Sequence, residues 1–249
     1  MNIYHLIYEP SFKSLTFHHW SKCNLSCLGC FCQVEKLDFS LFGDVTKQLQ
    51  TKTSEVAPER FIKSLQELDE LICNLQIERA VYIGVEPTLD PDFVTICSHM
   101  KEKYNTYNVL ITNGVKIIDL KDIDEVVFSI KAITNDLHKY YTGHSNKQIL
   151  KNFRTIYDMG KKLQAETLFI PDLIEDTEVE KVAQFIASID KNIPLRIDGY
   201  FAINDKPWPS ASTSEVTYAV SLAKKYLNTV NYLTSNSPLL GEKPIRLFG

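Results

Sequence analysis

Four of the six cysteines in this chain of 249 residues fall within ten positions of one another. Cys23, Cys27 and Cys30 form a C-x3-C-x2-C run, and Cys32 follows two residues later. Three thiolates on one short loop suit three irons of a cubane iron–sulfur cluster, because each iron prefers a soft thiolate ligand. The fourth iron would lack a protein ligand and stay open to a small molecule, as a catalytic metal keeps an open position. The spacing therefore predicts a single 4Fe-4S cluster with one reactive iron.

A zinc site is the alternative for these cysteines. Structural zinc sites usually add a second Cys or His pair further along the chain. Neither Cys73 nor Cys97 belongs to such a pair, although His99 lies two residues after Cys97, so we favour the cluster. Cys32 is expected to be a small buried residue. As a fourth ligand it would instead indicate an electron carrier or sensor, because carriers ligate all four irons from the protein.

The elements that would position this loop alternate between strand-like and helix-like segments. Strands are expected at residues 15–20, 79–85, 108–111, 125–132, 163–170 and 195–201, with a short last one at 231–233. Helices are expected at residues 57–75, 91–103, 146–159, 177–189 and 214–227. The cluster loop spans 21–32, and the polar residues 33–55 that follow indicate a long loop. Residues 200–249 are harder to assign.

This order of elements favours parallel strands joined by right-handed crossovers. We expect an α/β fold, a partial (β/α)6 barrel, with a doubly wound sheet as the alternative. Because no linker or repeat interrupts the chain, residues 1–249 are expected to form a single domain. In both folds the chemistry belongs at the C-terminal ends of the strands. Asp198, near the end of the sixth strand, is therefore a candidate catalytic residue.

Two motifs together resemble the radical SAM (S-adenosylmethionine) superfamily: the cysteine run, and Gly84-Val85-Glu86-Pro87 at the end of the second expected strand. Members of that superfamily bind SAM through its amino and carboxylate groups on the fourth iron, and a Gly-Gly-Glu-Pro stretch meets the amino group. The resemblance implies that Gly84 and Glu86 contact SAM, and a carboxylate is a suitable acceptor for an ammonium group. It also implies that the partial barrel is of the radical SAM type.

The middle of the chain is similar to the pyruvate formate-lyase activating enzyme family. Thr112 and Asn113 begin a Thr-Asn-Gly match, and Ser129 and Lys131 stand where that family has Asp-x-Lys. The resemblance implies that Thr112, Asn113 and Ser129 lie in the SAM site. It also implies that Lys131 projects toward the SAM carboxylate as a catalytic and cofactor-binding residue, and a lysine at a strand end is a sensible partner for a buried anion.

Another block, residues 138–146, matches the family's His-Lys-x-x-Thr-Gly-x-x-Asn, and we interpret it as mostly structural, with Asn146 as a helix N-cap. Four positions depart from the family. Val85 replaces the second Gly of the Gly-Gly-Glu-Pro motif. Ser129 and Ile111 replace aspartates that help to hold a monovalent cation beside SAM, and Gly29 stands where an aromatic residue is usual. The resemblance therefore does not imply a cation site here.

The implied activity is reductive cleavage of SAM to a 5'-deoxyadenosyl radical, which abstracts hydrogen from a substrate. The implied partners are a one-electron donor, such as flavodoxin or ferredoxin, and a protein or peptide substrate, which could be a glycyl-radical enzyme. A small molecule or RNA is the alternative substrate. The formal net charge of −4 argues against RNA, since phosphate contacts require Lys and Arg.

The N-terminal residues show no basic flank, long apolar core or cleavage site of a signal peptide. No stretch approaches the roughly 20 apolar residues that span a bilayer. We therefore expect a cytoplasmic protein without a membrane partner, in which clustered cysteines indicate metal rather than disulfides.

Overall fold

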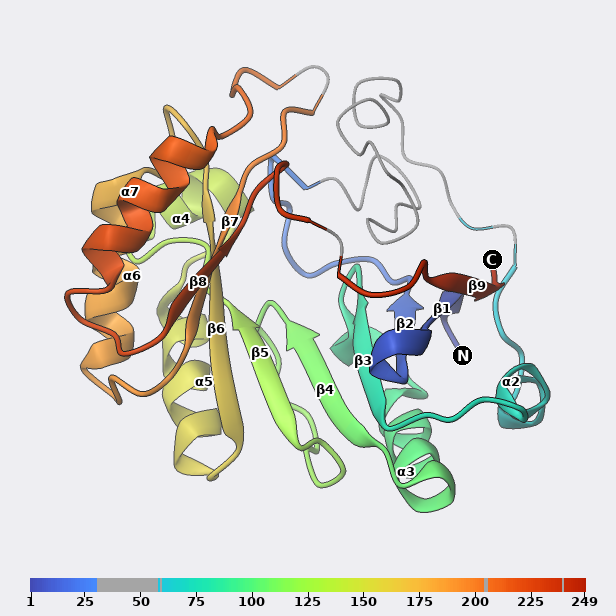
Figure 1. Ribbon diagram of the computed structural model, residues 1–249. Helices are drawn as coiled ribbons and strands as arrows, with labels where there is room; N and C mark the ends of the chain where they lie inside the picture. The colour runs from blue at the N-terminus through green and yellow to red at the C-terminus, as the bar shows by residue number, and fades with distance from the viewer. Residues whose placement is uncertain (31–57, 59, 204–205, 239) are drawn as a thin grey trace.

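The structure is a computed structural model that describes residues 1–30, 58, 60–203, 206–238 and 240–249. Its described strands form one sheet in the order β8-β7-β6-β5-β4-β3-β2-β1-β9 (Figure 1). The strands are β1 (Ile3–Glu9), β2 (Ser14–His19), β3 (Arg79–Gly84), β4 (Tyr107–Thr112), β5 (Glu125–Ser129), β6 (Lys162–Phe169), β7 (Leu195–Gly199), β8 (Val230–Leu233) and β9 (Ile245–Phe248).

Strands β2 to β8 all run parallel. Strand β1 lies antiparallel to both β2 and β9. Strands β8 and β9 are the two edges of the sheet and do not pair with each other, so the barrel is open. The expected partial barrel is thereby confirmed. Strands β1 and β9 were not predicted, although the run Ile3–Glu9 is apolar and almost entirely buried, as a strand covered on both faces requires.

The described helices are α2 (Leu65–Ile72), α3 (Phe93–Tyr104), α4 (Asn135–Thr142), α5 (Lys147–Asp158), α6 (Asp176–Ala187) and α7 (Thr213–Ala223). Helix α3 packs on β4, α5 and α6 pack on β6, and α7 packs on β7 and β8 (Figure 1). Residues 113–124, between β4 and β5, contain no helix, so this unit departs from the strand–helix repeat.

Two helix predictions were wrong. The helix expected over residues 57–75 begins only at Leu65, because Ser64 is its N-cap and accepts a hydrogen bond from the Glu67 backbone N–H at 3.1 Å; residue 57 lies outside the described residues. Helix α4 was missed altogether, because two of its three buried residues, His138 and Thr142, are polar and so do not form an apolar stripe.

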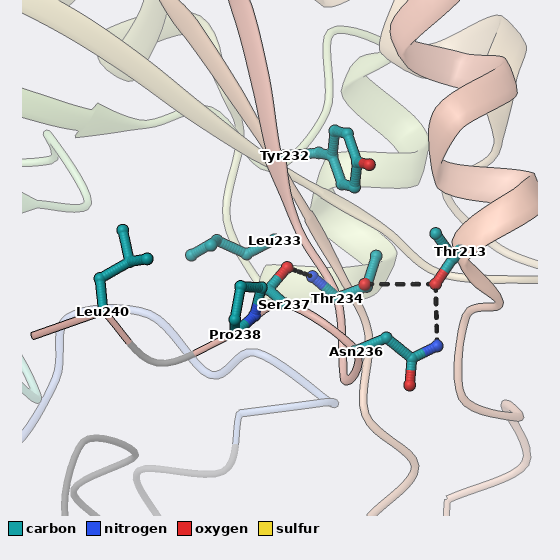
Figure 2. Close-up of a pocket in the computed structure, with 8 residues that line it drawn as sticks. All are labelled: Thr213, Tyr232, Leu233, Thr234, Asn236, Ser237, Pro238 and Leu240. Carbon is teal, nitrogen blue, oxygen red and sulfur yellow. Dashed lines mark hydrogen bonds between the residues drawn. The ribbon is translucent and has the colours of Figure 1, made fainter.

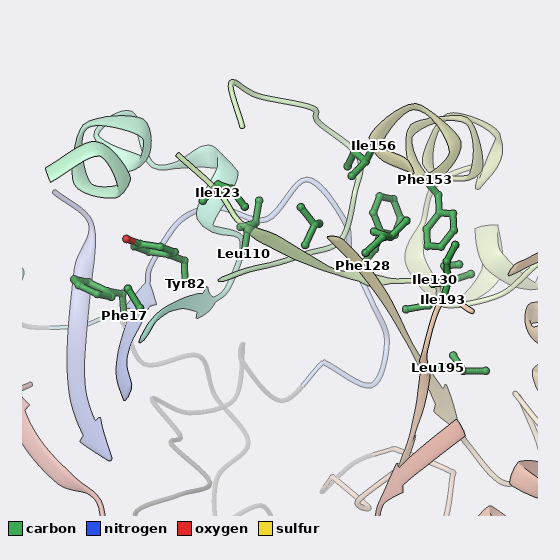
Figure 3. Packing of buried hydrophobic residues seen from close by; sticks show 14 of the residues in the cluster. Phe17, Tyr82, Leu110, Ile123, Phe128, Ile130, Phe153, Ile156, Ile193 and Leu195 are labelled. Carbon is green, nitrogen blue, oxygen red and sulfur yellow. The ribbon is translucent and has the colours of Figure 1, made fainter. Parts of the chain in front are cut away.

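The buried apolar side chains form two separate groups. The main core lies between the sheet and its helices, where the ring centroids of Phe17 and Tyr82 are 5.0 Å apart and those of Phe128 and Phe153 are 5.2 Å apart (Figure 3). The second group, which we call the loop-side cluster, consists of Tyr141, Ile170, Ile174, Tyr200, Ile203 and Trp208. Burying each such side chain stabilises the fold by about 1.5–3 kcal/mol.

Within the described residues, the helices are all too short or too polar to cross a bilayer.

Candidate active site

The cysteine loop leaves the end of β2 and is held by the last turn of α4. The backbone N–H groups of Ser26 and Leu28 donate to the carbonyls of Thr142 and Tyr141 at 2.8 and 2.9 Å. Carbonyls at a helix C-terminus lack partners within the helix, so they are free to accept these bonds. Residues 138–146 were predicted to be mostly structural. Within this segment, the carbonyls of Tyr141 and Thr142 anchor the cysteine loop.

Asn146 does precede α5, as predicted, but it makes no side-chain cap. Its Nδ2 instead donates to the carbonyls of Ala132 and Ile133, at 3.1 and 2.6 Å. The amide side chain thus ties the start of α5 to the segment that follows β5. The predicted position is confirmed, whereas the predicted capping contact is wrong.

The thiols of Cys23, Cys27 and Cys30 lie partly buried on this loop. Burial raises the pKa of Cys27 to about 12; nearby Lys131 opposes this shift, and the Cys30 and Cys23 thiols add to it. The Cys23 Sγ accepts the Leu25 N–H at 3.4 Å and the Asn113 side-chain N–H at 3.5 Å. Soft sulfur donors that receive N–H bonds suit an iron–sulfur cluster, whose potential such bonds tune. Cys32 and the loop at 33–55 lie outside the described residues.

Glu86 is the centre of a hydrogen-bond network at the ends of β3 and β4. Its side chain is buried, and the residue is only 1% exposed. Oε1 accepts the hydroxyls of Thr88 and Thr112 at 2.6 and 2.8 Å. Oε2 accepts the Asn113 backbone N–H at 2.9 Å. Since Asn113 also contacts Cys23, this network joins Glu86 to the cysteine loop.

Gly84 brings β3 close to the end of β2. Its φ is +119°, and a Cβ at this position would lie 2.3 Å from the carbonyl oxygen of His19. Only glycine fits both constraints. The close approach lets the Val85 N–H donate to that same carbonyl at 2.9 Å, which sets the position of Glu86 next to the cysteine loop.

A second network, the β5–β7 charge network, consists of Ser129, Glu166, Arg196 and Asp198. Register pairs Ser129 with Glu166 and Glu166 with Arg196 across three strands. The Ser129 hydroxyl donates to Glu166 Oε1. Arg196 donates to Glu166 at 2.6 Å and to both oxygens of Asp198 at 2.8 and 2.9 Å. Two carboxylates thus share one guanidinium.

Lys131 lies half-buried just beyond the end of β5. Its positive charge acts to lower the pKa of Cys27, and also that of Asp198. Burial nevertheless raises the pKa of Asp198, although Arg196 acts to lower it. Lys131 therefore lies near both Cys27 and Asp198, and Ser129 is joined to Asp198 through Glu166 and Arg196.

Sequence reasoning missed Glu166 and Arg196. Each occupies a partly exposed position in a strand whose neighbouring positions are buried. This alternation marks the face of the sheet turned away from the helices. The sequence does contain a signal for these residues. Arg196 and Asp198 are charged residues two positions apart in a strand, which places both on that same face of the sheet.

A pocket of about 340 Å³ lies elsewhere, between β8, the start of α7 and the segment after β8 (Figure 2). Thr213 links its walls through side-chain hydrogen bonds to Thr234 and Asn236 at 3.3 and 3.1 Å. None of the predicted site residues lines it.

Residues 17–186 match the family model of the radical SAM superfamily. The chain therefore belongs to that superfamily, and it is an enzyme that uses a 4Fe-4S cluster and SAM, as predicted.

Its relatives include activating enzymes. A protein of Methanocaldococcus jannaschii named as a glycyl-radical enzyme activating enzyme is 28% identical over 243 residues, covering 93% of this chain and 84% of that protein. The pyruvate formate-lyase-activating enzyme of Streptococcus mutans is 29% identical over 137 residues, covering 50% of this chain and 52% of that protein. The structure of Streptococcus suis SuiB bound to S-adenosylmethionine matches with a TM-score of 0.59 at 14% identity, over 85% of this chain and 48% of that one.

Proposed function

We propose that the enzyme acts on a protein or peptide, and that its substrate is a glycyl-radical enzyme which it activates. One observation carries this choice of substrate: the relative named as a glycyl-radical enzyme activating enzyme aligns with 93% of the chain. The proposed electron donor is a flavodoxin or ferredoxin, because reductive cleavage of SAM needs one electron from outside the protein.

Cys23, Cys27 and Cys30 are the proposed ligands of the cluster. The structure supports them through the soft donor set and through the N–H bonds that Cys23 receives from Leu25 and Asn113. When bound, the cluster and SAM supply a 5'-deoxyadenosyl radical that takes a hydrogen atom from the substrate. The protein binds and orients both cofactors and excludes water from them.

Glu86 is the proposed acceptor for the SAM ammonium group, with Gly84, Thr112 and Asn113 placing its carboxylate. It suits this role because its oxygens already accept bonds from Thr88, Thr112 and Asn113, all of them neutral donors. Among the described residues this carboxylate has no cationic partner, and the SAM ammonium group would supply one.

Lys131 is the proposed partner of the SAM carboxylate, since it lies close enough to Cys27 to influence that thiol. Asp198 is proposed to face the substrate or the ribose, held in place by its two bonds from Arg196. Ser129 is proposed to line the same space, next to Glu166.

The cluster assignment is tested by metal analysis of protein prepared without oxygen. We expect about four irons and four sulfides for the wild type, and loss of both in Cys23→Ala, Cys27→Ala and Cys30→Ala. Cys73→Ala is the matched control, because Cys73 is exposed at the end of α2 and should leave the cluster intact. Stoichiometric zinc without sulfide would overturn the assignment.

The substrate assignment needs a separate experiment. The reduced enzyme is mixed with SAM and a purified glycyl-radical enzyme, and electron paramagnetic resonance is recorded. A glycine-centred radical on the partner supports the proposal. A modified soluble product without a protein radical would instead favour a small molecule or RNA substrate.

A further inference from the structure

Gly29, which directly precedes Cys30 in the loop, lies against two tyrosine rings. A Cβ on Gly29 would lie 2.9 Å from Cε2 of Tyr200 and 3.1 Å from the hydroxyl oxygen of Tyr141. Gly29 is not among the glycines with positive φ, so its backbone conformation does not require glycine. The surrounding space favours glycine, because a Cβ would lie closer than ordinary van der Waals contact to both tyrosines, and they would have to shift.

Trp208 completes this group of rings. Its centroid is 6.3 Å from that of Tyr141 and 6.2 Å from that of Tyr200, in edge-to-face arrangements that aromatic pairs prefer. All three side chains are at least nine-tenths buried. They belong to the loop-side cluster, on which Cys27 and Leu28 also pack.

The rings are fixed from outside the cysteine loop. Tyr141 belongs to α4, and its backbone carbonyl accepts the Leu28 N–H at 2.9 Å. Tyr200 follows β7, and its N–H donates to the Phe169 carbonyl of β6 at 2.9 Å. The Cys27–Cys30 half of the loop therefore rests on side chains that three other parts of the chain hold in position.

We infer that Tyr141, Tyr200 and Trp208 form an aromatic cover that positions the Cys27–Cys30 half of the loop and shields the cluster on that side from water and oxidants. The inference rests on the proposed ligand role of Cys27 and Cys30. An apolar shell controls how solvent reaches a metal centre, and removing part of it admits water. The three aromatic residues are positioning residues, since they act through the loop and do not ligate iron.

The test uses Tyr200→Leu and, as a matched control, Phe153→Leu. Phe153 is also a fully buried aromatic residue, but it lies in the main core on α5. Both variants lose part of a ring, so both should lower the melting temperature. We measure iron and sulfide content without oxygen, and then the rate at which cluster absorbance disappears in air. Tyr200→Leu should lose its cluster several-fold faster than Phe153→Leu.

A second pair of variants keeps the test decisive if Tyr200→Leu folds poorly. Gly29→Ala should clash with the Tyr200 ring and speed cluster loss, and Gly29→Ala combined with Tyr200→Leu should lose the cluster more slowly than the sum of the two effects. Equal air sensitivity in Tyr200→Leu, Gly29→Ala and Phe153→Leu would overturn the aromatic cover. A wild type that binds no iron and sulfide would instead overturn the proposed function.

Discussion

The two carboxylate networks beside the cysteine loop are built in opposite ways. Glu86 is almost fully buried and is bound only by neutral donors, and among the described residues it has no ion pair. Glu166 and Asp198 share the guanidinium of Arg196 and keep part of their surface exposed. One network has a negative charge without a cation, and the other contains its own cation.

This difference indicates which network is prepared for a charged ligand. A buried charge is costly unless it is paired, and hydrogen bonds from neutral donors offset only part of that cost. A ligand ammonium would complete the Glu86 network. In the β5–β7 charge network each carboxylate already has the Arg196 guanidinium as its partner, although two carboxylates share that one cation. We therefore expect this network to hold Asp198 and Ser129 in fixed positions.

Arg196→Met should have the largest effect, because it leaves Glu166 and Asp198 without a counter-ion. We expect the free energy of unfolding to fall by about 2–3 kcal/mol, less than for a fully buried pair, since 27% of the Arg196 side chain is exposed. Denaturant titration measures the loss. Arg154→Met is the control, because Arg154 lies on the surface of α5, where it contacts Ser188 and the Phe185 ring and forms no ion pair among the described residues. Equal losses would contradict the role of the network.

The loss in Arg196→Met should also depend on pH. Burial raises the pKa of Asp198 and Arg196 acts to lower it, so the variant should have a still higher Asp198 pKa. A group whose folded pKa is raised binds its proton more tightly in the folded state, so its contribution to stability falls as pH rises through that pKa. The deficit should be smallest in acid, below the ordinary aspartate range, and should grow toward neutral pH.

Glu86→Ala should have the next largest effect, on SAM binding rather than on stability. Removing the carboxylate leaves the SAM ammonium without its acceptor, at a cost of about 1–3 kcal/mol in binding free energy. Equilibrium binding to the reconstituted protein measures it. Glu125→Ala is the matched control, since Glu125 is also buried but lies at the first residue of β5, bonded to Tyr107 and Lys162. Unchanged SAM affinity in Glu86→Ala, with the fold intact, would show that Glu86 is misplaced.

Sequence patterns predicted the Glu86 network better than the β5–β7 charge network. Glu86, Thr112 and Asn113 lie in short blocks at strand ends, where the chain itself marks the boundary by Pro87 or by a Thr-Asn-Gly turn. Their convergence follows from parallel strands ending at one edge.

Glu166 and Arg196 lie inside strands, so no turn marks them. The residues with which Glu166 and Arg196 pair depend on the register between β5, β6 and β7. The sequence pattern of a single chain did not predict that register. The fold was also predicted unevenly from the sequence. The bounds of the periodic helices α3, α5, α6 and α7 were predicted within a few residues. Helix α4 and the edge strand β9 were not predicted; both are short, and short elements depend mainly on tertiary packing for their stability.

Lys131→Met should weaken SAM binding by about 1 kcal/mol, because the half-buried lysine loses only a partly screened interaction with the SAM carboxylate. Potassium or sodium should matter little to the wild-type enzyme, since the cation is a side chain. Lys162→Met is the control, because Lys162 is exposed at the start of β6 and bonds to Glu125. An enzyme that requires potassium and tolerates Lys131→Met would show that a metal cation site exists among residues that this assignment omits.

Ser129→Asp should have the smallest effect on SAM binding, and it tests whether the two networks act separately. Ser129 faces Glu166 directly across β5 and β6 and donates its hydroxyl to it. An aspartate there would place two carboxylates side by side at a buried position, and such a like-charge pair destabilises the fold. Added potassium should recover part of the lost stability by bridging the two carboxylates. The melting temperature of Ser129→Asp should therefore rise with potassium more than that of Ser129→Ala.

SAM affinity is the second measurement on Ser129→Asp. Glu86 lies after β3 and not on β5 or β6, so SAM affinity without potassium should change less in Ser129→Asp than in Glu86→Ala. If Ser129→Asp shows neither lowered stability nor a response to potassium, the Ser129 hydroxyl does not face Glu166, and the β5–β7 charge network begins only at Glu166.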